Sequence, residues 1–362
     1  MYSVEEKLCI LFGDMEISSK KFFALQDFFG DIATAAEAIL SDSDAERILG
    51  ENYKAVKKAL QSGKADKIIQ NMEKNGVFAV TVFSPYFPQS LREIDDPPYN
   101  LFCKGNADLL ASDCIAVVGT RKVSSYGRRI ATDFTKVLCE HFTIVSGLAY
   151  GADSVAHETT LEFGGKTIAV LGSGVVNVYP ATNQNLSQKI VESGGLLVSE
   201  YGTESTPVPY HFPHRNRIVS GLSRGLLVCQ APLKSGTLST VELALDQGKD
   251  VFVVPGEIYD NGYTGSNNLI KSMQGACVTT PMDICDYYRV GVCKQEHKVV
   301  QLDFDEQKVA DALSEGPLTF DRLVEKTKIR PADLNFLLAN LELKSIIAKL
   351  PGNSYRLYGG IE

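Results

Sequence analysis

The pattern of hydrophobic positions divides the chain into three zones. The first zone, up to about residue 64, holds short amphipathic segments of helical period that break at glycines, as is typical of a small helical bundle. In the second zone, near-continuous apolar runs of strand length alternate with helical segments. The apolar runs are 77–83, 101–105, 114–119, 142–147, 166–172, 195–200, 225–230, 250–256 and 276–280, and the later ones are separated by the helical segments 125–141, 152–165, 182–195, 237–249 and 266–275.

This alternation predicts βαβ units and a parallel sheet covered on both faces. We therefore expect an α/β fold with a Rossmann-like, doubly wound and mostly parallel sheet over 65–292. A helical domain of helix-hairpin-helix or SAM-like type should precede it over 1–64. The third zone, 300–362, shows three helical segments and two short strand runs around a glycine turn, which predicts a winged helix.

Composition excludes several classes of protein. No run approaches the roughly 20 apolar residues of a membrane span, and the acidic opening segment does not resemble a signal peptide. Eight cysteines without a CxxC pair indicate reduced thiols in the cytoplasm, and neither a disulfide framework nor a zinc site. The net charge of −8 argues against a protein coated in positive charge, so a polyanion would need a local patch.

Small and polar residues follow four of the predicted strands, where loop amides and helix N-termini bind anions in parallel sheets. One alternative is that the glycines only make tight turns, but four such loops at successive strand ends favour a phosphate-lined crevice. The candidate residues are Gly119, Thr120, Arg121, Ser146, Gly147, Gly151, Gly172, Gly174, Lys234, Ser235, Gly236 and Thr237.

The known nucleotide fingerprints are missing. No GxxxxGK[ST] motif occurs, and the nearest dinucleotide pattern, 172–177, lacks its third glycine. We therefore expect no cofactor, and nicotinamide binding is disfavoured. His211 and His214 have no third ligand near them in sequence, so no metal is expected, and His157 is interpreted as a helix-surface histidine.

Charge placement is more informative than total charge. No acid occurs between Asp113 and Asp133 or between Glu204 and Glu242, although each stretch carries four basic residues. They are Arg121, Lys122, Arg128 and Arg129 in the first stretch, and Arg215, Arg217, Arg224 and Lys234 in the second. A solvated helix face or internal ion pairs would explain one such stretch, whereas two that flank strand ends suggest an electrostatic footprint for phosphates.

The second stretch also contains Phe212, next to Arg215, Asn216 and Arg217. Aromatic rings stack on bases while guanidinium groups hold backbone phosphates, which is how single strands are bound without sequence readout. Phe212 as a stacking platform and Phe212 as a core residue are about equally supported by the sequence.

These motifs, in this order, resemble the DprA/Smf family of DNA-processing proteins. The matching strings include VVGTR, SGLAYGAD, HFPHRNRIVSGLS, SGTLSTVELAL and GSNNLIKSMQGA, and the resemblance extends over about residues 78–358. It implies a non-enzymatic, cytoplasmic, usually dimeric protein that binds single-stranded DNA and loads the RecA recombinase onto it during natural transformation. The dimer would form around 265–280, through Leu269, Ile270 and Met273, although a buried helix face would explain these apolar side chains nearly as well.

The chain departs from the family pattern at two places. Cys229-Gln230 stands where family members often carry a glutamate, and Pro207-Val208-Pro209 stands where basic residues are frequent, so DNA affinity is expected to be weaker than typical. An alternative is a nucleotide-processing phosphoribohydrolase of the Lonely Guy type. Its catalytic acids would fall at Ser239 and Thr240, and Glu242 is about 200° or more around the helix from them.

Overall fold

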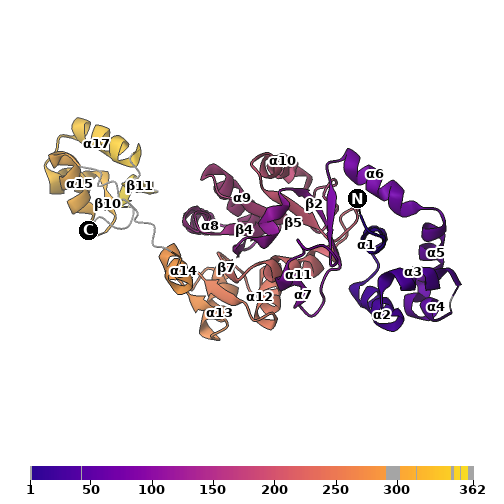
Figure 1. Ribbon diagram of the computed structural model, residues 1–362. Coiled ribbons are helices and arrows are strands. Elements are labelled where there is room, and N and C mark those ends of the chain that lie inside the picture. Colours follow the sequence, from indigo (N-terminus) through magenta and orange to yellow (C-terminus); the bar gives the residue numbers. More distant parts are fainter. Residues whose placement is uncertain are drawn as a thin grey trace. The chain divides into compact units, whose positions relative to one another are not determined.

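Two compact units, Met1–Val292 and Cys293–Glu362, make up the chain (Figure 1). The structure is a computed structural model that describes residues 2–41, 43–290, 302–314, 316–343, 346–350 and 352–357. Over these residues, every helix is too short or too polar to cross a membrane.

A sheet of nine strands, counted over the described residues, forms the centre of the larger unit in the order β1-β2-β6-β5-β4-β3-β7-β8-β9. The strands are β1 (Phe78–Thr81), β2 (Asn100–Gly105), β3 (Cys114–Val118), β4 (Thr143–Ser146), β5 (Thr167–Val170), β6 (Leu196–Ser199), β7 (Gly225–Val228), β8 (Asp250–Val253) and β9 (Ala276–Cys277). Those from β6 to β9 are parallel, whereas β2 runs antiparallel to both β6 and β1. The predicted doubly wound, mostly parallel sheet is confirmed.

Helices cover both faces of this sheet, and most of them pack into two cores, one on each face. They are α7 (Gln89–Arg92), α8 (Ser125–Leu138), α9 (Ala152–Glu162), α10 (Gln184–Glu192), α11 (His211–Leu222), α12 (Gly236–Asp246), α13 (Thr264–Lys271) and α14 (Pro281–Tyr288). Residues of α8, α9 and α14 build one core, and residues of α11 and α12 build the core on the opposite face. In Figure 1, α9 and α10 lie above the strands, and α11 and α12 lie below them.

The direction of winding reverses between β3 and β7. From β3 the chain winds outward through β4 and β5 to β6, and α11 then carries it back to β7 on the other side of β3. At such a switch point the loops on either side diverge and leave a crevice, where ligands of open α/β sheets usually bind.

His157 corrects one expectation from sequence. The side chain lies on α9, which is flanked by α8 and α10, and it is fully buried rather than at the helix surface. Its Nδ1 lies 2.7 Å from Thr167 Oγ1 on β5. Burial lowers the pKa of His157 to about 3, so the ring is neutral and structural.

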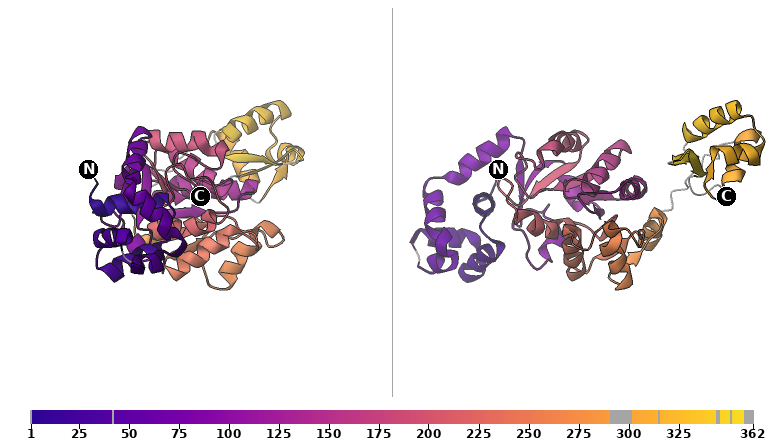
Figure 2. Two further views of the ribbon diagram at one scale, coloured as in Figure 1. Left: turned by 90° about the vertical axis from the view of Figure 1, so that its right-hand side faces the viewer. Right: turned by 180° about the vertical axis from the view of Figure 1, so that it is seen from behind.

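The N-terminal helices pack against the β1–β2 side of the sheet (Figure 2). They are α1 (Val4–Asp14), α2 (Ser19–Phe29), α3 (Ile32–Ser41), α4 (Ser43–Leu49), α5 (Tyr53–Gln61) and α6 (Lys64–Lys74). Ser3 and Glu6 close a capping box on α1, and Phe102 of β2 belongs to the same apolar core as the helices. The predicted boundary at residue 64 coincides with the start of α6, and by contact the helices and the sheet form one unit.

The smaller unit is the predicted winged helix. Its elements are α15 (Phe304–Leu313), β10 (Leu318–Thr319), α16 (Phe320–Thr327), α17 (Pro331–Leu343), β11 (Ile347–Leu350) and β12 (Ser354–Leu357). The strands pair in the order β10-β12-β11, and Asp303 with Glu306 forms a capping box at the start of α15. Buried leucines such as Leu323, Leu334 and Leu338 fill its core.

Candidate nucleic-acid interface

The four loops singled out in the sequence lie at one edge of the sheet, because they follow the adjacent parallel strands β5, β4, β3 and β7. Three of them are hydrogen-bonded to one another. The amide of Thr120 donates to the carbonyl of Gln230 at 2.8 Å, and the amide of Ala152 donates to the carbonyl of Thr120 at 3.3 Å. These bonds hold the loops after β3, β4 and β7 together as one rim at the switch point.

Gln230, part of the first departure from the family pattern, stabilises this rim. Its buried amide oxygen accepts from the backbone N–H of Ser124 at 2.9 Å and from the Ser124 hydroxyl at 3.2 Å. Ser124 also caps α8 by accepting from the amide of Gly127. Gln230 thus joins the loop after β7 to the N-terminus of the helix that follows β3, a role that sequence reasoning missed.

Two of the glycines are required by close approach. Gly151 has φ +79°, and a Cβ there would collide with the carbonyl of Thr120. A Cβ on Gly172 would lie 2.8 Å from the ring of Phe212, so the loop after β5 passes directly beneath that ring. Both glycines are needed because a side chain would collide with a neighbouring group, which is a different role from donating an amide hydrogen to a phosphate.

A partly exposed aromatic group lies above this loop. The Phe212 ring is half-buried, its centroid is 5.9 Å from the guanidinium carbon of Arg121, and it is 5.4 Å from the ring of Tyr179 at an angle of 52°. Tyr179 is 45% exposed and Arg121 is exposed. We call Arg121, Tyr179 and Phe212 the Phe212 patch. Tyr179 follows β5, and no local pattern in the sequence marks it as a neighbour of Phe212.

The N-terminus of α12 adds a second feature on the same edge. Ser235 caps the helix by accepting from the amide of Thr237 at 3.2 Å, while Lys234 and Gly236 are exposed. A Cβ on Gly236 would meet no atom within 4 Å, so the approach to this turn is open. An open helix N-terminus beside a lysine is a favourable place for an anion.

Arg215 is not an exposed phosphate ligand in this structure. Its buried guanidinium donates to the carbonyls of Gly147, at 2.8 Å, and of Val170. Asp153 lies beside it and accepts from the amides of Gly147 and Ala149 at 3.2 and 3.3 Å. Burial lowers the pKa of Arg215 to about 10 and raises that of Asp153. The expectation of a phosphate contact is replaced by a positioning role that holds the loops after β4 and β5.

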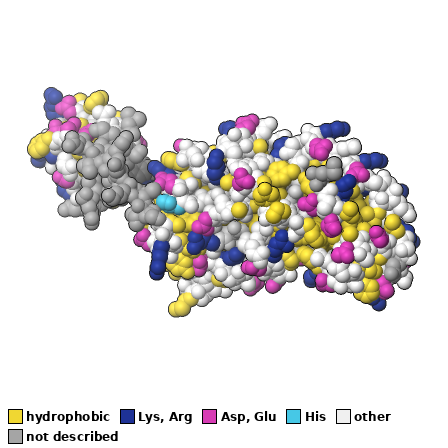
Figure 3. All heavy atoms as spheres, in the orientation of Figure 1, with side chains coloured by type: hydrophobic (Ala, Val, Ile, Leu, Met, Phe, Trp, Pro, Cys, Tyr) yellow, Lys and Arg dark blue, Asp and Glu magenta, His cyan; other side chains and the backbone are white. Residues whose placement is uncertain are grey.

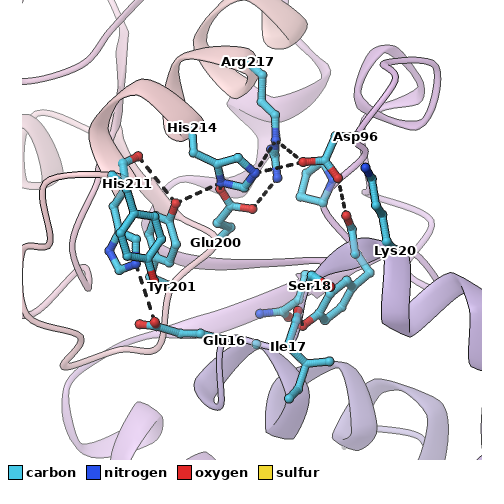
Figure 4. Close-up of a pocket in the computed structure, with 16 residues that line it drawn as sticks. Glu16, Ile17, Ser18, Lys20, Asp96, Glu200, Tyr201, His211, His214 and Arg217 are labelled. Atoms are coloured by element: carbon cyan, nitrogen blue, oxygen red, sulfur yellow. Dashed lines mark hydrogen bonds and ion pairs between the residues drawn. The ribbon is translucent and has the colours of Figure 1, made fainter. Parts of the chain in front are cut away.

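Arg217 lies in a different network (Figure 4). Its Nε is 3.1 Å from Asp96 Oδ2 and its Nη2 donates to Glu200, and the side chain is buried. His214 joins both carboxylates, at 2.8 Å from Asp96 and 3.1 Å from Glu200. Because two carboxylates already neutralise Arg217, the expectation that it holds a DNA phosphate is also corrected.

The remaining predicted residues divide by exposure. Ser146 and Thr237 are buried, and the Ser146 hydroxyl donates to the carbonyl of Val117. The amide of Gly174 donates to the carbonyl of Ser205, so it is already used within the protein. The residues that remain accessible at the edge are Gly119, Thr120, Arg121, Gly151, Phe212, Asn216, Lys234, Ser235 and Gly236.

The second basic stretch does not form one patch. Arg224 precedes β7 and therefore lies at the opposite edge of the sheet, where it pairs with Asp113 at 2.6 Å and covers the ring of Tyr288. Arg215 and Arg217 are buried, so Lys234 is the basic residue of this stretch that is exposed at the carboxyl edge. Figure 3 shows basic and acidic side chains interspersed over the larger unit, consistent with the net charge of −8.

The chain is similar to DNA-processing proteins over most of its length. Residues 78–289 match the family described as DNA recombination-mediator protein A, and residues 295–353 match the DprA winged helix domain. Protein Smf of Escherichia coli is 34% identical, over 96% of this chain and 92% of its own length. The DNA processing protein DprA of Streptococcus pneumoniae is 43% identical, over 56% of this chain and 72% of its own.

Two solved structures are similar to the chain. The structure of DprA from Streptococcus pneumoniae has 33% identity and a TM-score of 0.68, and the match covers 79% of this chain and 98% of that one. DNA processing protein A from Helicobacter pylori, described for its single-stranded DNA binding mode, has 30% identity and a TM-score of 0.53, covering 58% of this chain and 95% of that one.

Proposed function

The chain belongs to the DNA recombination-mediator protein A family, and from this premise we propose that it binds single-stranded DNA along the carboxyl edge of its parallel sheet. The observation that carries the proposal is the Phe212 patch, where an exposed guanidinium and two accessible aromatic rings lie together at the switch point. The similar Helicobacter pylori protein is described as a single-strand binder, which supports the same chemistry here.

The proposed contacts separate bases from phosphates. Phe212 and Tyr179 offer ring faces to unstacked bases, which are available in single strands and not in duplex DNA. Arg121, Lys234 and the first turn of α12 offer positive charge to the backbone on either side. Such a site selects strandedness without reading sequence.

The site favours binding over catalysis. In the phosphoribohydrolase alternative, acids would be needed on the first turn of α12, where Ser239 is exposed and the Thr240 hydroxyl donates to the carbonyl of Gly236. Asp153, the carboxylate within the rim, is buried beside Arg215. An acid–base pair for glycosidic cleavage therefore has no support at this edge.

Binding of a labelled poly-dT oligonucleotide, measured by fluorescence anisotropy with the full chain, tests the proposal. We expect poly-dT to be displaced by unlabelled poly-dT but far less by a duplex of equal length. Equal competition by both, or release of free base from nucleoside monophosphates with no strand binding, would favour the alternatives.

We also propose, from the family, that the protein acts as a homodimer that loads RecA during transformation. A groove of about 460 Å³ between α12 and α13 supports the dimer, because leucines such as Leu233 and Leu238 line it and Met273, which stands between two lining residues in the chain, is 94% exposed. Of the three predicted contacts, Leu269 is buried within this groove's wall and Ile270 is partly buried. Light scattering should give twice the monomer mass, and Met273→Glu should halve it; a wild-type monomer at micromolar concentration would contradict the dimer.

A further inference from the structure

A cavity of about 340 Å³ lies between the N-terminal helices and the sheet, in the range usual for small-molecule sites (Figure 4). Its walls come from the segment between α1 and α2, the segment before β2, the end of β6 and the first turn of α11. Since β6 is next to β5, this cavity lies at the same carboxyl edge as the Phe212 patch. His211 lines it and Phe212 is the next residue, so the first turn of α11 takes part in both.

Three buried side chains that line the cavity have unused hydrogen-bonding atoms. Five atoms make no hydrogen bond within the described part of the chain. They are the side-chain oxygen and nitrogen of Asn100, both ring nitrogens of His211, and the Nη1 of Arg217. Asn100 is 2% exposed, His211 is fully buried and Arg217 is 4% exposed. Glu16 Oε2 lies 3.5 Å from the Nε2 of His211. Leaving such buried groups unsatisfied is unfavourable, so a ligand that pairs with them would bind at an advantage.

The charges around the cavity compensate one another. Hydrogen bonds to Asp96 and Glu200 raise the pKa of His214 to about 9, so its positive charge and that of Arg217 balance the two carboxylates. Glu16, which faces His211, and Lys20 also line the cavity and add one charge of each sign. A free phosphate would meet these carboxylates, and a cation would find them already paired, so the lining favours an uncharged ligand.

Apart from Ser18 and Ser19, the remaining lining is aromatic and apolar. Tyr201 stacks on His211 with ring centroids 3.7 Å apart, while Tyr99 and Tyr210 contribute further rings. Tyr210 is 63% exposed at the mouth, beside the first turn of α11. A flat, uncharged heterocycle with both donors and acceptors matches this combination of rings, carboxamide and imidazole.

We infer that this cavity binds a nucleobase, with the Asn100 amide and the His211 ring pairing with its edge. Asparagine is well suited, because its carboxamide presents a donor and an acceptor side by side, as in its pairing with adenine. The base would come from a free nucleoside or from the bound strand next to the nucleotide on Phe212. The second source rests on the proposed function, whereas the first does not.

Fluorescence quenching of 2-aminopurine deoxyriboside by the full chain tests the cavity directly. We expect saturable quenching that Asn100→Leu weakens about tenfold or more, because the leucine keeps the volume and removes both polar atoms. Asn100→Leu should not lower the melting temperature, since the amide has no partner to lose. Asn71→Leu on α6 is the matched control and should titrate like the wild type.

A second arm separates the two sources. If a strand base occupies the cavity, saturating nucleoside should weaken poly-dT binding several-fold; if only free nucleosides enter, poly-dT binding should stay unchanged. Phe212→Ala should reduce strand binding and leave nucleoside quenching intact, so failure of strand binding is distinguishable from failure of the cavity. Tyr210→Ser, at an exposed position, gives a second variant and should also weaken quenching. Identical nucleoside titrations for the wild type, Asn100→Leu and Tyr210→Ser would overturn the inference.

Discussion

Two arginines of the same helix show how position decides the role of a residue. Arg215 and Arg217 are two positions apart on α11, and about 100° of rotation per residue directs them to different sides of the helix. Arg215 therefore reaches the loops after β4 and β5, whereas Arg217 reaches Asp96 and Glu200. The sequence shows only two basic residues beside an aromatic one. That both are buried depends on partners from distant segments, which no local pattern contains.

Truncation of Phe212 separates base stacking from packing. We expect Phe212→Ala to weaken poly-dT binding by about 1–3 kcal/mol, the usual contribution of one base–aromatic contact. Because the ring is only half-buried against Gly172, the free energy of unfolding should fall by less than the roughly 3–5 kcal/mol typical of a core phenylalanine. Anisotropy and thermal melting measure the two quantities. Phe134→Ala in the core is the control and should lower stability by the larger amount. A Phe212→Ala protein that is strongly destabilised yet binds normally while folded would show that the ring only packs.

Arg121 and Arg224 form a matched pair at opposite edges of the sheet. Arg121 is exposed beside Phe212, so Arg121→Ala should weaken binding to every oligonucleotide alike and reduce the salt slope by about one. Arg224→Ala removes the same charge at the other edge and should leave affinity and slope almost unchanged. Titrations of poly-dT at several salt concentrations compare them. An equal effect of both changes would mean that only net charge matters.

At the scale of elements, His214 in the first turn of α11 connects the segment before β2 to the segment after β6. Its ring lies between Asp96, before β2, and Glu200, after β6, and the pKa of Asp96 is lowered chiefly by the His214 hydrogen bond. The pKa of Glu200 is raised by burial but lowered more strongly, by Arg217 first and by His214 next, so it is below its usual value. Both carboxylates therefore stay ionised and favour a protonated His214.

This network predicts a pH dependence of stability. The pKa of His214 rises from an ordinary 6.5 to about 9 in the fold, so its contribution is complete below pH 6.5 and is lost as the pH rises toward 9. The difference in melting temperature between the wild type and His214→Gln should be largest near pH 6 and shrink steadily toward pH 9. His141→Gln is the control. A difference that does not change over this interval would contradict the assignment.

Elements that are buried on both sides could be predicted from the sequence, because strands β3 to β8 must be near-continuously apolar. The four loops could be placed at one edge for the same reason, since parallel strands bring their carboxyl ends together. The network of His214 could not be predicted from the sequence. Asp96 and Glu200 stand 118 and 14 positions before His214 in the chain, and the three residues share no motif. The antiparallel attachment of β1 and β2 depends on similar long-range pairing.

At the scale of the whole molecule, a chain of net charge −8 needs a local site for a polyanion. The larger unit offers such a site at the carboxyl edge of its sheet, with Arg121 and Lys234 exposed there. The winged helix has eight basic and ten acidic residues between Asp303 and Glu362, so its net charge of −2 makes it a poor primary contact. We therefore propose that single strands bind at the sheet and not at the winged helix.

Photo-crosslinking of a poly-dT strand that contains 5-iodouracil, followed by mass-spectrometric mapping on the full chain, tests this assignment most directly. We predict crosslinks in the peptides that contain Tyr179 and Phe212, reduced by Phe212→Ala and competed by unlabelled single strands. Crosslinks confined to the winged helix, or to the opposite edge around Arg224 and Tyr288, would contradict the account.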